Sequence, residues 1–67
     1  MNKLKEIEAF VAATEAGTLT AAALREGVTP VMMGRRIDAL EKRLGVKLLH
    51  RSTRHLSVTQ QGVVFLD

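Results

Sequence analysis

The chain has 67 residues and a formal net charge of +3, a length that allows one domain and excludes a second one. Hydrophobic residues make up 46% of the sequence but aromatic residues only 3%, so the core must be aliphatic, which favours helices over a β-sandwich. The absence of cysteine excludes a disulfide framework and a thiolate metal site, and it fits a reducing compartment such as the cytoplasm.

The first predicted element is a helix from about residue 4 to residue 16. Apolar side chains at intervals of three, four and seven residues share one face of it: Leu4, Ile7, Phe10 and Val11. Asn2 is available as its N-cap, and Gly17 can take the left-handed conformation that ends a helix. The many charges before Ala9 are typical neither of a signal peptide nor of a membrane span, so no membrane contact is expected.

A short second helix is predicted over residues 21–26, with Thr18 or Thr20 as its cap and Gly27 as its stop. It contains three consecutive alanines, which let another helix approach closely. A short helix followed by a turn with glycine is typical of a helix-turn-helix. High helix propensity alone would also explain the alanines.

The third predicted helix begins sharply, because Thr29 can cap it and Pro30 suits the first helical position. Gly45 ends it. Its expected buried stripe has spacings of four, three and four residues and consists of Met33, Ile37, Leu40 and Leu44. The methionines are interpreted as packing or groove-facing side chains, not as ligands.

Beyond Gly45 the pattern becomes strand-like, first with Val46, Leu48 and Leu49 and then with residues 56–58. A basic stretch lies between them, so the two strands predict a wing around residues 50–55. Thr59 can cap a last helix, whose apolar residues are Val63, Val64, Phe65 and Leu66.

The positive charge is concentrated in the second part of the chain. Residues 1–26 carry three basic and four acidic side chains, a net −1, whereas residues 27–67 carry seven basic and three acidic ones, a net +4. A basic half suggests a polyanionic partner, although solvated surface charges alone would give the same asymmetry.

In this order the elements resemble the N-terminal domain of LysR-type transcriptional regulators over essentially all of the chain. The resemblance rests on Phe10-Val11-Ala12, Gly17-Thr18-Leu19-Thr20 with Ala22-Ala23, Val28-Thr29, Arg35 with Ile37, Leu40-Glu41, Leu44-Gly45-Val46, Leu48-Leu49 with Arg51-Ser52-Thr53-Arg54, and Leu56-Ser57-Val58-Thr59 with Gly62. It implies a mainly α fold, a winged helix-turn-helix with a three-helix core and a two-stranded wing over residues 1–58. Residues 59–67 would be the start of a C-terminal linker helix.

The resemblance also implies how such a domain is used. In that family this domain binds double-stranded DNA, the linker helix pairs two subunits into a homodimer, and a later domain senses a small-molecule effector. The chain is therefore expected to be part of a longer bacterial regulator, with the effector bound only by a domain that lies beyond it. Neither a cofactor nor a metal is expected.

In a helix-turn-helix the N-terminal residues of the second helix meet base edges in the major groove, here within a reading helix of about residues 29–44. The candidate contacts are Thr29, Pro30, Val31, Met32, Gly34, Arg35 and Arg36. Arg35 is expected to donate two hydrogen bonds to a guanine, the alternative being a phosphate contact. Arg36 is better placed for phosphate or solvent.

Three of these positions depart from the resembled family. The family usually has Gln where this chain has Pro30, Pro or Ser where it has Val31, and Ser where it has Gly34. The departures predict fewer hydrogen bonds to bases and more contact with thymine methyl groups, hence a T-rich element in the half-site. Gly34 would also permit close approach of the backbone to DNA. The family usually has a buried Leu at the position of Glu26. A charged residue there requires either a shifted helix end or a solvent-exposed side chain.

The wing supplies a second set of candidate contacts. Arg51, Ser52, Thr53 and Arg54 can reach the DNA backbone, and Arg54 is expected in the adjacent minor groove. Thr20, near the start of the second helix, is expected near another phosphate.

Other classes of function fit less well. An enzyme needs a pocket with convergent polar groups, which so small a domain rarely encloses, and His50 with His55 cannot complete a metal site without further ligands. A winged helix used for protein–protein contact is the remaining alternative, with the wing and Met32 as the partner surface.

Overall fold

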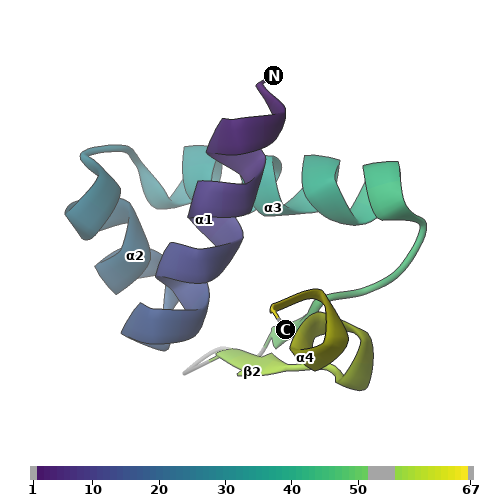
Figure 1. The fold of residues 1–67 in the computed structure, drawn as a ribbon. Helices are drawn as coiled ribbons and strands as arrows, with labels where there is room; N and C mark the ends of the chain where they lie inside the picture. The colour runs from purple at the N-terminus through teal and green to yellow at the C-terminus, as the bar shows by residue number, and fades with distance from the viewer. Residues whose placement is uncertain (1, 52–55, 67) are drawn as a thin grey trace.

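The computed structural model describes residues 2–51 and 56–66, which form four helices and a two-stranded sheet (Figure 1). The elements are α1 (Lys3–Ala16), α2 (Leu19–Glu26), α3 (Pro30–Leu44), β1 (Leu49–Arg51), β2 (Leu56–Val58) and α4 (Gln60–Leu66). The strands are antiparallel, with Leu49 opposite Val58 and Arg51 opposite Leu56. The predicted fold class, a mainly helical winged helix-turn-helix, is confirmed.

The helices begin and end at local signals in the sequence. The Asn2 side chain accepts a hydrogen bond from the N–H of Leu4 at 2.7 Å, and Thr18, rather than Thr20, caps α2 by accepting from the N–H of Ala21 at 3.1 Å. Each of the first three helices ends at a glycine with a φ of 70° to 84°, a left-handed conformation that side chains disfavour.

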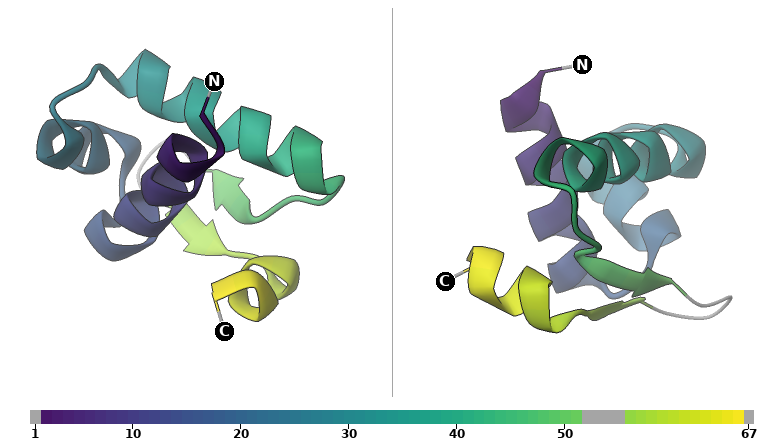
Figure 2. Two further views of the ribbon diagram at one scale, coloured as in Figure 1. Left: turned by 45° about the horizontal axis from the view of Figure 1, so that its top comes forward. Right: turned by 90° about the vertical axis from the view of Figure 1, so that its right-hand side faces the viewer.

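The core lies where α1, α2 and α3 cross, and residues just before and within β1 close it from below (Figure 2). Its largest fully buried apolar side chains are Phe10, Met33, Ile37, Leu40 and Leu48. Small residues also belong to this core, with Ala13 of α1 and Ala22 and Ala23 of α2 almost completely buried. Two of the three consecutive alanines of α2 are therefore packed inside the domain.

The expected apolar stripes are partly wrong. On α1, Phe10 is buried as predicted, but Leu4 is 60% exposed, and the inward face also carries Glu6 and Ala9. The charged Glu6 can be buried because Arg43 neutralises it. On α3, Leu44 is 39% exposed because it is the last residue of the helix, where the chain turns away from the core.

Two further expectations are settled at element ends. Val46 is exposed and lies outside β1, because among the described residues the pairing with β2 begins at Leu49. Glu26 is exposed as the last residue of α2, so of the two alternatives the solvent-exposed side chain is correct.

The short α4 packs against the rest of the molecule. The ring of Phe65 meets Phe10 of α1 edge to face, with the ring centroids 5.7 Å apart. Gly62 lies against the chain at Leu48 so closely that a Cβ there would overlap the Leu48 carbonyl oxygen. Within the described ranges, no helix combines the length and apolarity that crossing a membrane requires.

Candidate nucleic-acid interface

Helices α2 and α3 form a helix-turn-helix with residues 27–29 as the turn. The turn is closed by the backbone, because the N–H of Val28 donates to the carbonyl of Ala23 at 3.0 Å. The first turn of α3 and the ends of the strands next to residues 52–55 lie towards the same side of the molecule, whereas α4 lies on the other side (Figure 2). The start of the predicted reading helix and the described strand ends at the base of the wing therefore lie on a common side of the molecule.

The first two turns of α3 carry most of the predicted contacts in exposed positions. Those exposed are Thr29, Pro30, Val31, Met32 and Arg35. With about 100° between successive residues, Arg35 points almost opposite to the buried Ile37, and Val31 and Met32 flank it one turn earlier. Within residues 2–51 and 56–66, neither Arg35 nor Arg36 forms an ion pair. Arg35 is thus presented to solvent between two apolar side chains.

The other two predicted residues of α3 are less open. Gly34 is buried, and a Cβ on it would lie 3.9 Å from Cδ1 of Leu19, so this position faces α2. Arg36 is half-buried. Thr20 is exposed near the start of α2. The serine that the resembled family usually has at position 34 would therefore have its side chain on the face of α3 that is turned towards α2.

At the wing, the predicted contacts divide into two groups. Ser52, Thr53 and Arg54 lie outside the described residues. Arg51 lies in β1, and its guanidinium pairs with Asp38 of α3 at 2.7 Å and with Glu41 at 3.7 Å. Its charge is therefore engaged within the domain, which the sequence did not indicate.

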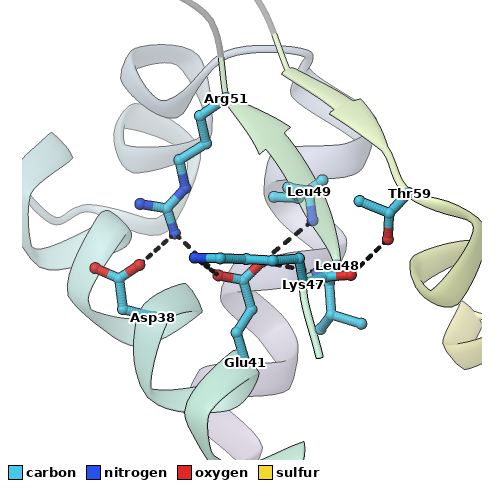
Figure 3. A network of polar contacts seen from close by, with 7 residues as sticks. All are labelled: Asp38, Glu41, Lys47, Leu48, Leu49, Arg51 and Thr59. Atoms are coloured by element: carbon cyan, nitrogen blue, oxygen red, sulfur yellow. Dashed lines mark hydrogen bonds and ion pairs between the residues drawn. The ribbon is translucent and has the colours of Figure 1, made fainter. Parts of the chain in front are cut away.

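Glu41 connects α3 to the strand that leads into the wing (Figure 3). Its Oε2 accepts hydrogen bonds from the backbone N–H groups of Leu48 at 2.8 Å and Leu49 at 3.2 Å. Its Oε1 lies 3.7 Å from Lys47 Nζ. Sequence reasoning missed this residue, although one signal was present: an acid four residues after Ile37 falls on the buried face and needs partners there.

Thr59 holds the same segment from the α4 side (Figure 3). Its hydroxyl donates to the Lys47 carbonyl at 2.6 Å and accepts from the N–H of Gly62 at 3.0 Å, so the predicted cap of the last helix is present. Its own N–H donates to the Leu48 carbonyl at 2.9 Å. On β2, the N–H of Leu56 donates to the Gly17 carbonyl at 2.8 Å. The base of the wing is thus fastened to α1, α3 and α4.

A buried carboxylate of α1 fastens the same C-terminal part of α3 to α1. Glu6 is 1% exposed and accepts from Nε and Nη2 of Arg43 at 3.0 and 2.9 Å. These hydrogen bonds favour the ionised carboxylate and lower the pKa of Glu6, although burial opposes the shift. The same contact raises the pKa of Arg43. Charged contacts therefore hold the C-terminal half of α3 both to α1 and to β1.

Among the described residues, no three acidic or histidine side chains gather into a possible metal site. An open groove of about 510 Å³ lies between α4 and the loop after α3, with an apolar lining except for Gln60 and Gln61. It contains no acid or base for catalysis, and it lies away from the first turn of α3.

Comparisons with known proteins agree with this architecture. Residues 4–63 match the family model described as bacterial regulatory helix-turn-helix protein, lysR family. The chain is 42% identical over 67 residues to an HTH-type transcriptional repressor of Pseudomonas aeruginosa, and 38% identical over 65 residues to the regulator TfdT of Cupriavidus pinatubonensis. The two alignments include 100% and 97% of this chain but only 21% and 28% of the length of those proteins.

Two similar crystal structures are protein–DNA complexes. The CbnR DNA-binding domain in complex with DNA matches with a TM-score of 0.91 and 41% identity, covering 98% of this chain and 75% of that one. The BenM DNA-binding domain on catB site 1 DNA matches with a TM-score of 0.88 and 34% identity, covering 97% and 72%. The similarity extends over nearly the whole chain in both cases.

Proposed function

Because the chain belongs to the LysR family of bacterial regulatory helix-turn-helix proteins, we propose that it binds double-stranded DNA sequence-specifically as the DNA-binding part of a transcription regulator. Helix α3 would enter the major groove with its first two turns, and the wing would lie near the adjacent minor groove. The role is one of binding and not of catalysis, in line with relatives that are named transcriptional regulators.

The observation that carries this proposal is the exposed Arg35 on the outward face of α3. A guanidinium there can donate two hydrogen bonds to O6 and N7 of a guanine, which is worth about 1–3 kcal/mol of discrimination against another base. Thr29 and Arg36 on the same helix, Thr20 on α2, and Ser52, Thr53 and Arg54 in the wing are proposed to contact the DNA backbone or the neighbouring groove.

Binding to random-sequence duplex DNA at low and moderate salt tests the proposal. Contacts with phosphates release counterions, so log affinity should fall linearly with log salt, by about 0.9 per neutralised phosphate. A winged helix used only for protein–protein contact would show little affinity for DNA and little salt dependence. That result would replace the proposal with the alternative function.

Replacing Arg35 tests sequence reading as opposed to general attraction. On a duplex selected from random DNA, Arg35→Ala should relax base preference at one position of each half-site. Lys42→Ala is the control, because Lys42 is an exposed cation on the same helix but near its other end. Equal weakening of Arg35→Ala on all sequences would make Arg35 a phosphate contact.

The chain spans 21% of the length of the first of these relatives. The properties of a whole regulator are therefore proposed separately from those of this domain. We infer that residues 1–58 form the DNA-binding unit and residues 59–67 begin a helix that pairs two subunits into a homodimer. A small-molecule effector would act through another domain, and the regulator would work in the cytoplasm without a cofactor in this domain.

A further inference from the structure

The first turn of α3 presents an apolar tip, formed by Pro30, Val31 and Met32, to the solvent. Val31 is 65% exposed and Met32 is 43% exposed. Neither belongs to the buried cluster or to the partly buried side chains packed against it. Their exposure beside Arg35, on the proposed reading face, means that core packing does not account for them.

Several polar groups of this turn are already used or missing. Pro30 has no N–H, and the N–H of Met32 donates to Thr29 Oγ1 at 3.1 Å. The N–H of Met33 donates to the Thr29 carbonyl at 3.0 Å. Between Thr29 and Arg35 no side chain carries a hydrogen-bonding group other than the weakly accepting sulfur of methionine. The apolar tip therefore has little with which to read the hydrogen-bonding groups of a base.

The major-groove edge of a base pair has one apolar feature, the C5-methyl group of thymine. 5-Methylcytosine carries the same group on the same ring carbon. A duplex, and not an apolar protein surface, is the expected occupant, because the cationic Arg35 and Arg36 lie on the same stretch of α3 and complement phosphate charge.

We propose that Val31 and Met32 recognise the C5-methyl group of a pyrimidine, so that thymine and 5-methylcytosine are both accepted at one position of the half-site. This inference rests on the proposed DNA binding. It goes beyond a thymine preference, because it assigns recognition to the methyl group and none to the group at ring position 4, where the two bases differ.

Four versions of one duplex test this. A sequence selected from random DNA is made with T·A, deoxyuridine·A, 5-methylcytosine·G or C·G at each pyrimidine position of the protected half-site, and Kd is measured for the 67-residue chain. T against deoxyuridine and 5-methylcytosine against C each change only the methyl group. Burial of one methyl predicts about fourfold tighter binding in both comparisons at the same position.

The outcomes separate the inference from the function on which it rests. Equal Kd values within each methyl pair would overturn methyl recognition. Kd values that follow the group at ring position 4 would also overturn it. In that case T and deoxyuridine would bind equally, and both would bind more tightly than cytosine and 5-methylcytosine. Either result leaves DNA binding intact, whereas failure to bind any duplex, selected or random, would overturn both proposals.

Variants assign the methyl effect to the apolar tip. Val31→Ala combined with Met32→Ala should reduce the fourfold ratios to about one while binding of the deoxyuridine duplex persists. Val64→Ala is the matched control, because Val64 is 71% exposed on α4, away from the tip. Ratios that survive in the double variant would show that other side chains read the methyl.

Discussion

Two glycines of this protein lie within helices and are buried, yet their surroundings differ. A Cβ added to Gly34 would make an ordinary contact with Leu19, at 3.9 Å. A Cβ added to Gly62 would overlap the backbone oxygen of Leu48 and lie 2.6 Å from Cγ1 of Val58. The structure therefore has room for a Cβ at position 34 and has none at position 62.

We expect alanine to have opposite effects at these two positions. Gly34→Ala should stabilise the domain by about 0.5–1 kcal/mol, because glycine loses more backbone entropy on folding. Gly62→Ala should destabilise it by about 1–3 kcal/mol through overpacking. Urea unfolding of both variants measures the free energies. A Gly62→Ala variant that is not destabilised would mean that α4 is not held against Leu48 as described, and a destabilised Gly34→Ala variant would mean that position 34 has no room for a Cβ.

The buried Glu6 predicts a pH dependence of stability. Its pKa is lowered in the folded protein, so its contribution is complete above its ordinary value of about 4.5 and is lost as the pH falls through the lower, folded-state pKa. Glu6→Gln should therefore lower the urea midpoint at pH 7, and the difference from the unmodified chain should shrink below about pH 4. Glu8→Gln, at an exposed position of the same helix, is the control. A difference that is constant across this range would contradict the assignment.

At the scale of elements, the wing is fixed to the reading helix by polar side chains. Glu41 accepts from the backbone at the start of β1, and Asp38 pairs with Arg51 within it. Thr59 holds the same segment from α4. A two-stranded hairpin is marginally stable alone, so its direction relative to α3 depends on these attachments.

Arg51 is accordingly predicted to tie β1 to α3. In a double-mutant cycle with Asp38→Asn, Arg51→Gln should show a coupling of up to about 1 kcal/mol, because the pair is partly exposed. The salt slope of DNA binding should not change with Arg51→Gln. A slope reduced by about 0.9 would instead identify Arg51 as a phosphate contact.

At the scale of the molecule, a chain of this size has little core to spare, and α4 contributes to it. Phe65 covers Phe10, and Thr59 takes part in four hydrogen bonds, two with the segment before β1 and two with its own helix. The helix proposed to continue towards a second subunit is therefore also part of the folded domain. Because Thr59 bonds to Lys47 and Leu48, a displacement of α4 would disturb the base of the wing.

Removing the packing of α4 tests this dependence. Phe65→Ala should lower the free energy of unfolding by about 1–3 kcal/mol, from lost burial and the lost edge-to-face contact. Val64→Ala should change it little, since that side chain is exposed. A chain ending at Val58 should be less stable still. Full stability of that shorter chain would show that residues 1–58 fold independently.

The sequence by itself determined the order of the elements and the limits of α3, because caps, glycine stops and proline act within a few residues of each other. Thr29 with Pro30 and the glycine at position 45 define α3 without reference to any other part of the chain. The order of these local signals was also sufficient for the family resemblance, and with it for the fold class.

Only the tertiary structure decided what each face of an element meets. Glu6 and Glu41 lie on buried faces because partners 37 and 7 to 8 residues away neutralise or bind them. Leu4 is left exposed, and Arg51, predicted for DNA, is engaged by Asp38. Such pairings depend on distances between elements remote in sequence, and helical periodicity carries no information about those distances.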